Sequence, residues 1–280
     1  MMNNDTRKCS EIAAAAARSN QIRSRTRLFF ASTLIMLTLV GCSAGSSPRG
    51  ELSENQQILA TCDPSAPPAS MVQIDGSGSS TSDAITAERM DAIESIIRTT
   101  AICSGHLKVV MFSASSAGAT ELFDGPLQLD GATSNARLKR VSALVSEVMG
   151  KIRKAYEPAL KSLASGGSDI TAQLRLASEW IGQLEDPYKL HLYVLTDGFQ
   201  NIGVDLSTRA LSRHEAAALA DQLLVPDLSG ASVVVAGLGR VAGNPPPSAV
   251  VEGLIDFYDA LCQRTGAAHC LSVTDYTAGQ

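Results

Sequence analysis

The chain has 280 residues, of which 45% are hydrophobic, so it is long enough to bury the core of an ordinary globular domain. Six of its 23 basic and two of its 28 acidic residues precede Cys42, so the chain from Cys42 onward has a net charge of about −9. Because an acidic protein repels polyphosphate and only 4% of the residues are aromatic, we expect no nucleic-acid partner.

An apolar run lies close to the beginning of the chain. Residues 28–40 read LFFASTLIMLTLV and follow an arginine-rich stretch. A membrane-spanning helix needs roughly 20 apolar residues, whereas a shorter run after basic residues is typical of a signal-peptide core. The run leads into the sequence LVGC, which ends at Cys42 and resembles the bacterial lipobox. An uncleaved anchor helix with an incidental cysteine is the alternative.

The resemblance to a lipobox implies a place in the cell. Residues 1–41 would be a signal peptide that is removed, and the thiol of Cys42 would receive a lipid. The protein would then be exported and held on the bacterial cell envelope, on the outer face of the cytoplasmic membrane or on the outer membrane. The next residues, 42–70, are rich in Ser, Gly and Pro and predict a flexible tether to a domain at 71–280.

The cysteines beyond the anchor position predict disulfide bonds. Apart from Cys9 in the leader and Cys42, four remain, namely Cys62, Cys103, Cys262 and Cys270. An even number in an exported domain favours disulfides over free thiols. Three pairings are possible, and proximity in sequence favours Cys62–Cys103 and Cys262–Cys270. Four free buried cysteines are the alternative.

Strand-like and helix-like patterns alternate from residue 71 to the end. Apolar runs predict strands at 71–74, 106–113, 119–129, 189–195, 231–238 and 269–273. Helical spacing predicts helices at 82–100, 134–164 with a bend near Pro158, 169–184, 214–224 and 250–265. This alternation predicts a doubly wound α/β fold, with a mostly parallel central sheet, helices on both faces and one antiparallel edge strand.

Two of the predicted strands lead into side chains that carry hard oxygen donors. The first strand runs into Asp75, and Ser77 and Ser79 follow it in the sequence DGSGS. The strong central strand runs into Thr196 and Asp197. In open parallel sheets, ligands bind beyond the carboxyl ends of the strands, where the strand order reverses. Carboxylate and hydroxyl oxygens grouped there predict a site for Mg²⁺ or Ca²⁺.

These residues resemble the metal-ion-dependent adhesion site of a von Willebrand factor type A (VWA) domain. The family pattern is D-x-S-x-S after the first strand, a threonine in a central loop and an aspartate after the fourth strand. Residues 75–79 and Asp197 match its first and last elements. The middle element falls in the sequence GGSDI, where Ser168 stands at the threonine position and Thr171 is the alternative ligand. The resemblance covers residues 71–276 and implies the same α/β fold.

The resemblance also implies a role for each residue. Ser77 and Ser79 would ligate the metal directly, while Asp75 and Asp197 would act mainly through bound water. Ser168 would ligate the metal when a partner binds. An Asp or Glu carboxylate of that partner would complete the coordination sphere. Because the direct ligands are neutral hydroxyls, the ion stays electrophilic and attracts an anion.

The expected function is therefore binding and not catalysis. The chain would be a lipid-anchored, extracytoplasmic module that captures an acidic residue of a partner protein through Mg²⁺, with Ca²⁺ or Mn²⁺ as the other candidate ions. A metal-independent scaffold in a cell-envelope assembly is the alternative. An accessory subunit of a metal chelatase or ATPase is disfavoured, because those partners use cytoplasmic nucleotides.

Three catalytic or cofactor motifs are weaker explanations of the same sequence. A haloacid-dehalogenase phosphatase needs a second aspartate where Ser77 stands. The glycines at 237–243 follow a strand but run into prolines, so no helix N-terminus is expected for a dinucleotide. The histidines, His106, His191, His214 and His269, fall mainly at strand starts, away from the expected site, and no G-x-S-x-G elbow is present.

The basic residues between 137 and 154 predict a solvated helix face, with anionic lipid headgroups as a minor alternative.

Overall fold

The structure is a computed structural model that describes residues 48–114, 119–163, 166–185, 187–207 and 209–277. The predicted signal peptide, 1–41, and the predicted lipidation site, Cys42, lie outside the described residues. None of the helices within the described ranges is long and apolar enough to cross a membrane.

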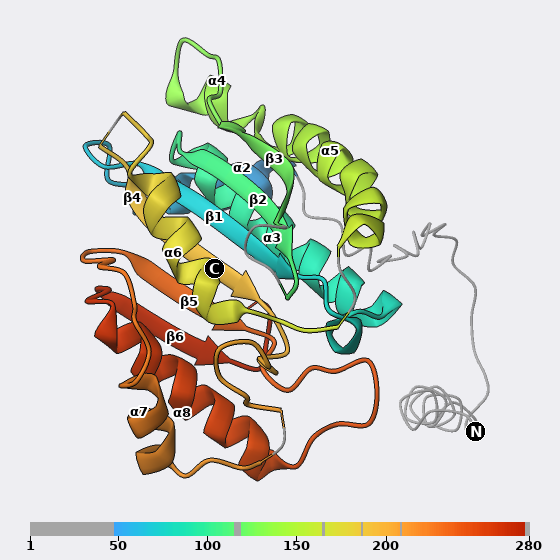
Figure 1. The fold of residues 1–280 in the computed structure, drawn as a ribbon. Coiled ribbons are helices and arrows are strands. Elements are labelled where there is room, and N and C mark those ends of the chain that lie inside the picture. The colour runs from blue at the N-terminus through green and yellow to red at the C-terminus, as the bar shows by residue number, and fades with distance from the viewer. Residues whose placement is uncertain (1–47, 115–118, 164–165, 186, 208, 278–280) are drawn as a thin grey trace, which may run out of the picture. The chain divides into compact units, whose positions relative to one another are not determined.

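A six-stranded sheet forms the centre of the described chain, with the strand order β3-β2-β1-β4-β5-β6 (Figure 1). The strands are β1 (Pro68–Asp75), β2 (His106–Phe112), β3 (Thr120–Pro126), β4 (Lys189–Leu195), β5 (Ser232–Ala236) and β6 (His269–Val273). All neighbouring pairs are parallel except β2 and β3, which pair antiparallel at one edge. The predicted fold class, including its antiparallel edge strand, is confirmed.

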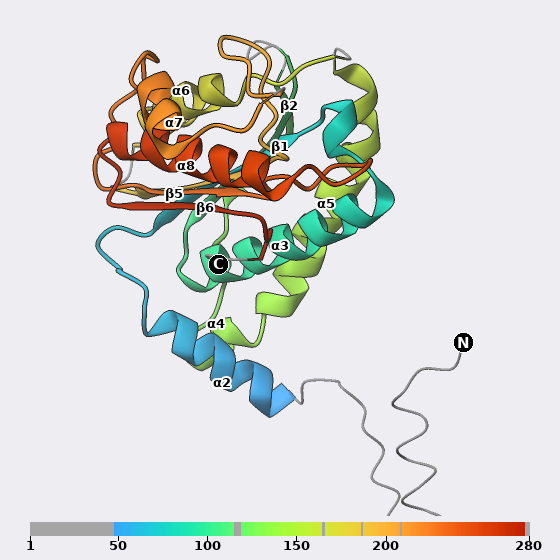
Figure 2. The same ribbon diagram turned by 90° about the horizontal axis from the view of Figure 1, so that it is seen from below.

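Helices cover both faces of this sheet (Figure 2). The helices are α2 (Pro48–Leu59), α3 (Asp83–Ile102), α4 (Ser134–Leu138), α5 (Val141–Ser162), α6 (Ile170–Ile181), α7 (Arg213–Ala220) and α8 (Ser248–Arg264). Helices α3 and α5 pack on one face, and α6, α7 and α8 pack on the other. Each face has its own cluster of buried apolar side chains.

Strand β1 connects the two core layers. All eight of its residues are buried, as expected for a central parallel strand that is covered on both faces. Val72 and Ile74 belong to the cluster beneath α3 and α5, and Met71 belongs to the cluster beneath α6, α7 and α8. The strand therefore fixes the position of Asp75, its last residue, with respect to both layers.

Side-chain caps set the starts of α3, α6 and α7. The Ser82 side chain accepts a hydrogen bond from the Ile85 amide at the start of α3, and Asp169 caps α6 in the same way. Ser212 and Glu215 form a reciprocal capping box at the start of α7. Caps of this kind contribute about 1 kcal/mol each, which explains why helix starts were close to their predicted positions.

The segment before β1 differs from the flexible tether expected for residues 42–70. Residues 48–59 form helix α2, and β1 begins at Pro68. Asn55 is buried and donates to the carbonyl oxygen of Leu138 (3.3 Å), and it accepts a hydrogen bond from Arg98 (3.0 Å). The Ser/Gly/Pro composition that predicted a tether is interrupted between about residue 50 and Pro64, where good helix formers such as Glu, Gln and Leu occur.

The helical region predicted at 134–164 also differs in detail. The structure interrupts it at Lys139 and Arg140, between α4 and α5, whereas Pro158, near which a bend was predicted, lies inside α5 and does not interrupt it. Pro158 is in the last turns of the helix, so the chain loses one backbone hydrogen bond and continues. No glycine or proline marks the actual interruption, so the sequence carried no signal for it.

The favoured disulfide pairing is confirmed. Cys62 is bonded to Cys103, with their Cα atoms 5.4 Å apart, and Cys262 is bonded to Cys270, with their Cα atoms 5.8 Å apart. The first bond ties the segment after α2 to the end of α3, and the second ties α8 to β6. Disulfides of this kind persist in oxidising compartments such as the periplasm and the cell surface.

Candidate metal site

The topology of the sheet brings the predicted site residues to one edge. Asp75 is the last residue of β1, and Asp197 follows β4, the strand that pairs with β1. Ser168 lies in the loop before α6, on the same carboxyl edge. Strand order reverses between β1 and β4, so this edge is the position where ligands bind in open α/β sheets.

The carboxylate of Asp75 organises the site. Asp75 is fully buried, and its Oδ1 accepts hydrogen bonds from the Ser77 amide (2.9 Å) and the Ser168 hydroxyl (3.0 Å). Its Oδ2 accepts from the Thr196 hydroxyl (2.7 Å) and from Ser168 (3.1 Å). These donors satisfy most of the acceptor capacity of Asp75, so this carboxylate positions hydroxyl groups more than it offers free oxygens.

The Asp-x-Ser turn itself is a common local motif in this chain, but the turn at Asp75 differs from the others. In the exposed turns at Asp63 and Asp227, the serine hydroxyl two residues later donates to the same aspartate. Ser77 keeps only the backbone bond to Asp75, and its hydroxyl instead lies 3.5 Å from that of Ser79. The buried turn thus leaves the Ser77 hydroxyl free of its own aspartate and next to the Ser79 hydroxyl.

The spacing of these hydroxyls suits a cation. A metal that binds two oxygens at right angles with bonds of about 2.1–2.5 Å holds them about 3.0–3.5 Å apart. The Ser77 and Ser79 hydroxyl oxygens, at 3.5 Å, match the upper end of that range. The short helical turn at Gly78–Ser80 sets this spacing, with the Ser80 amide bonded to the Ser77 carbonyl oxygen (3.0 Å).

Asp197 carries an unsatisfied buried oxygen. The residue is fully buried, and its Oδ1 accepts from the Phe199 amide (3.0 Å). Its Oδ2 has no hydrogen-bond partner in the described part of the chain. Burial and the nearby charge of Asp75 raise the pKa of Asp197 to about 6, although the Phe199 amide, Ser79 and Arg89 oppose the rise. A buried carboxylate oxygen in this state is costly unless a proton or a cation satisfies it.

A buried arginine forms hydrogen bonds to the loop that carries the candidate ligands. The Arg89 side chain is fully buried in α3 and donates to the carbonyl oxygen of Asp75 (2.8 Å) and to the Ser80 hydroxyl. Its guanidinium lies 5.3 Å from the ring centre of Tyr276, a distance typical of a cation–π contact. Arg89 therefore fixes the loop that carries the serines and partly balances the two carboxylates.

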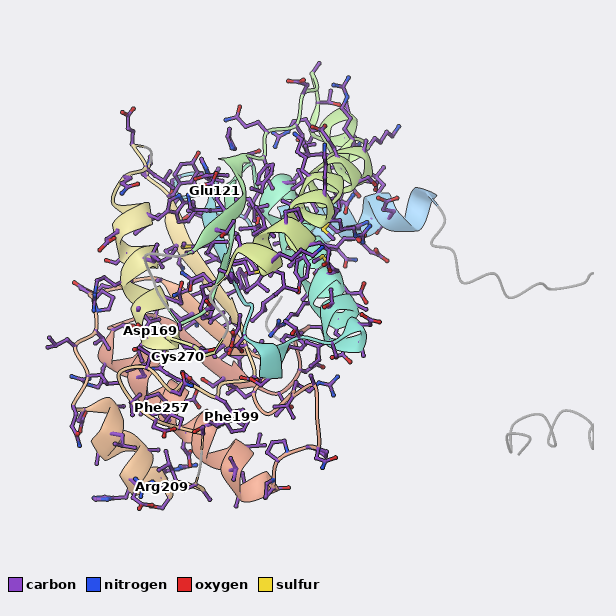
Figure 3. The ribbon with its side chains drawn as sticks, turned by 45° about the vertical axis from the view of Figure 1, so that its right-hand side comes forward. Glu121, Asp169, Phe199, Arg209, Phe257 and Cys270 are labelled. Atoms are coloured by element: carbon purple, nitrogen blue, oxygen red, sulfur yellow. A yellow bond between two sulfur atoms is a disulfide. The ribbon has the colours of Figure 1, made fainter. Side chains whose placement is uncertain are left out.

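The two candidate ligands of the central loop have different hydrogen-bond partners. The Ser168 hydroxyl is bonded to Asp75, whereas the Thr171 hydroxyl bonds to Asp169 (3.2 Å) and accepts from Gln200 (3.1 Å). Figure 3 shows Asp169 at the amino end of α6 and Phe199 in the loop that follows β4. The geometry thus places Ser168, and not Thr171, beside Asp75.

Several residues of the site were missed by the sequence analysis. Thr196 donates to Asp75, and the Asn201 side chain accepts from the Ser168 amide (3.0 Å), but neither was assigned a role. Arg89 had a readable signal: it stands four residues after Ile85 and four before Ile93, in the apolar stripe of α3. A charged residue in such a stripe is expected to be buried and paired.

The other groupings offer no competing site. Within the described ranges, no three His, Cys, Asp or Glu side chains are close enough to hold a metal ion. His106, His191 and His269 lie at the starts of their strands, on the opposite edge from Asp75, as expected. The glycines at 237–243 lead from β5 into a loop, and the next helix, α8, begins only at Ser248.

Comparisons with known proteins give no family assignment. No protein-family model matches the chain, and a search of the curated proteins found no match. Among solved structures, the chain resembles the conserved hypothetical protein BatB from Bacteroides thetaiotaomicron, with 14% identity and a TM-score of 0.39 over 74% of this chain and 90% of that one. It also resembles the pilus adhesin SpaC from Lactobacillus rhamnosus GG (12% identity, TM-score 0.40, 77% of this chain, 29% of that one). A third likeness is to proximal thread matrix protein 1 from the mussel byssus (13% identity, TM-score 0.35, 77% of this chain, 44% of that one).

Proposed function

We propose that this chain is a VWA-like binding module of the bacterial cell envelope that holds a divalent cation and uses it to bind a carboxylate of a partner protein. The ion would be Mg²⁺, or else Ca²⁺ or Mn²⁺, bound by Ser77, Ser79 and Ser168, with Asp75 and Asp197 acting mainly through water. We propose a binding role and no catalytic one.

The buried, unpaired Oδ2 of Asp197 carries this proposal. A fully buried carboxylate oxygen without a donor destabilises the fold, and a cation held by the neighbouring hydroxyls would remove that penalty. The donors at this edge are hard oxygens, which suit Mg²⁺ and Ca²⁺ and not soft metals. The residues therefore fit the ion that the resemblance implies.

The charges of the site favour an anionic partner once the metal is bound. Asp75 and Asp197 are balanced in part by the buried Arg89, which leaves one net negative charge among the three. Asp169 is turned toward the start of α6, where it caps the helix. A divalent ion would therefore give the cluster a net positive charge, and an Asp or Glu of a partner would neutralise it.

Export and lipid anchoring complete the proposal. The two disulfides support an oxidising compartment outside the cytoplasm. The sequence at Cys42 supports a lipid anchor on the membrane surface, from which the folded domain would meet its partner. Without metal dependence, the chain would instead be a scaffold component of an envelope assembly.

The test is thermodynamic coupling between metal and carboxylate. The affinity of the full chain for Mn²⁺, in detergent micelles, would be measured by electron paramagnetic resonance with and without N-acetyl-aspartate amide. We expect the carboxylate to tighten Mn²⁺ binding, and Mn²⁺ to tighten carboxylate binding by the same factor, since coupling is reciprocal. N-acetyl-asparagine amide should have no effect.

A matched pair of variants provides the control. Ser77→Ala/Ser79→Ala should lose both metal binding and coupling. Ser65→Ala/Ser229→Ala changes two serines of exposed Asp-x-Ser turns and should behave like the unchanged chain. Mn²⁺ binding that is indifferent to the carboxylate would contradict capture through the metal and would favour the scaffold alternative.

A further inference from the structure

A groove lies beside the candidate metal site. It has a volume of about 480 Å³ and is lined by α3, by the loop after β5, by α8 and by the residues that follow β6. Its lining includes Glu88, Asp91, Leu238, Arg240, Val251 and Asp275. We call these residues and the space between them the acidic groove. A volume of this size is typical of a small-ligand pocket.

Backbone contacts join the acidic groove to the site. The amide of Gly239, which lines the groove, donates to the carbonyl oxygen of Asp197 (2.8 Å). Three residues further on, the amide of Ala242 donates to the carbonyl oxygen of Ser79 (2.8 Å). The loop that forms one wall of the groove thus touches two of the residues assigned to the metal site.

The groove has a net negative charge of its own. It contains the carboxylates of Glu88, Asp91 and Asp275 and a single cation, Arg240, which is paired with Glu88. Hydrogen bonds from Thr277 and the nearby charge of Arg240 lower the pKa of Asp275, so this carboxyl is ionised at neutral pH. The three carboxylates outnumber the one cation, so Asp91 and the oxygen of Asp275 that does not accept from Thr277 remain as acceptors for a positively charged group.

Apolar side chains in the same groove suit the stem of a long basic residue. Leu238 and Val251 are part of its lining, and Pro245 and Pro246 lie beside them. Lys and Arg bury their aliphatic stems against apolar surface while the charged end contacts acidic groups. The acidic groove therefore complements Lys or Arg and repels Asp or Glu.

We infer that the partner segment carries a Lys or Arg within about three residues of its metal-binding Asp or Glu, and that this basic side chain occupies the acidic groove. This inference rests on the proposed function, because the acidic residue is placed by the metal. An extended peptide advances about 3.3 Å per residue, so three residues reach about 10 Å from the site. The metal would then bind the acidic side chain of the partner, and the acidic groove would bind its basic side chain.

A set of four labelled peptides tests the inference on the full chain in detergent micelles with Mg²⁺, by fluorescence polarisation. Each peptide has a Gly/Ser background and two variable positions. The first position is Asp or Asn, and the second is Arg or Gln, which gives the four combinations. The second position lies one to three residues before or after the first. We expect Arg to bind about fivefold more tightly than Gln, a value typical of a partly exposed pair of charges.

In the groove variant Asp91→Asn/Asp275→Asn, the ratio of the affinities for the Arg and Gln peptides should fall to near one. The tighter binding of the Asp peptides over the Asn peptides should persist. Asp130→Asn, an exposed aspartate beyond β3 at the opposite edge of the sheet, should leave both preferences unchanged.

The outcomes separate the two proposals. A preference for Asp without one for Arg, or a preference for Arg that survives in the groove variant, would overturn the acidic groove and leave metal capture standing. A preference for Arg without one for Asp in Mg²⁺ would count against the proposed function. If none of the peptides binds at millimolar concentration, the inference fails, and metal binding by itself decides the proposed function.

Discussion

At the scale of single residues, burial and not motif identity distinguishes the candidate site. The chain repeats the Asp-x-Ser turn at exposed positions, where the serine hydroxyl donates a hydrogen bond to the aspartate of its own turn. At Asp75 the turn is buried, and Thr196 and Ser168 satisfy the carboxylate in place of Ser77. The Ser77 hydroxyl therefore makes no bond to its own aspartate. A hydroxyl that is to ligate a metal must be free in this way.

The raised pKa of Asp197 gives a prediction for the metal-free protein. Its folded value of about 6 lies above its ordinary value of 3.8, so the folded state binds the proton more tightly than the unfolded state. The resulting stability is present below pH 3.8 and is lost as the pH rises through about 6. One pKa unit is worth about 1.4 kcal/mol, so we expect a loss on the order of 2–3 kcal/mol.

Urea unfolding in EDTA at a series of pH values would measure this loss. The Asp197→Asn variant should lack the fall in the free energy of unfolding between pH 4 and pH 7, and Asp130→Asn should retain it. Mg²⁺ should restore the stability of the unchanged chain at pH 7. Parallel pH profiles for the unchanged chain and Asp197→Asn would show that this carboxylate is already satisfied.

The sequence predicted the two aspartates and the three serines of the candidate site, but not the residues that support them. Asp75 and Asp197 could be placed because each follows an apolar run, and parallel strands end at one edge. The choice between Ser168 and Thr171 could not be made, since it depends on where the Gln200 side chain lies. The role of Arg89 likewise depends on its contact with the carbonyl oxygen of Asp75, which no local pattern encodes.

At the scale of helices and strands, the periodic elements were predictable and the aperiodic ones were not. Every strand of the sheet had been predicted, because continuous apolar runs identify buried parallel strands. Helix α2 was missed, since its helical stability depends on contacts with distant residues such as Leu138 and Arg98. The interruption between α4 and α5 has no local breaker and follows from packing.

The two disulfides should differ in their contribution to stability. Cys62 and Cys103 are 41 residues apart, whereas Cys262 and Cys270 are 8 residues apart. In the chain-entropy model, closing the longer loop stabilises the fold by about 4 kcal/mol and closing the shorter loop by about 2.5 kcal/mol. Urea unfolding of Cys62→Ala/Cys103→Ala and of Cys262→Ala/Cys270→Ala would measure both. Equal losses, or a larger loss for the shorter loop, would contradict this ordering.

At the scale of the whole molecule, the candidate site and the segment that follows α2 lie at opposite ends of β1. Asp75 lies at the carboxyl end of β1, and the Cys62–Cys103 bond fastens the chain near its amino end. The candidate site and this disulfide are therefore separated by the length of β1.

Lipid anchoring has its own test in bacterial cells. The unchanged chain should be recovered in the membrane fraction, and mass spectrometry should show a mature protein that begins at an acylated Cys42. The Cys42→Ala variant should keep its leader and carry no lipid. Recovery of an unacylated, uncleaved chain from unchanged cells would contradict the lipoprotein assignment and favour an anchor helix.

Isothermal titration of Mg²⁺ and Mn²⁺ into the full chain in detergent micelles, beside Ser77→Ala/Ser79→Ala and the matched Ser65→Ala/Ser229→Ala, decides whether the chain binds a divalent ion at the candidate site. We predict binding of one ion per chain to the unchanged protein and to the matched variant, with none to the site variant. Equal binding to all three would place the ion elsewhere. No binding to the unchanged protein up to millimolar metal would contradict the account.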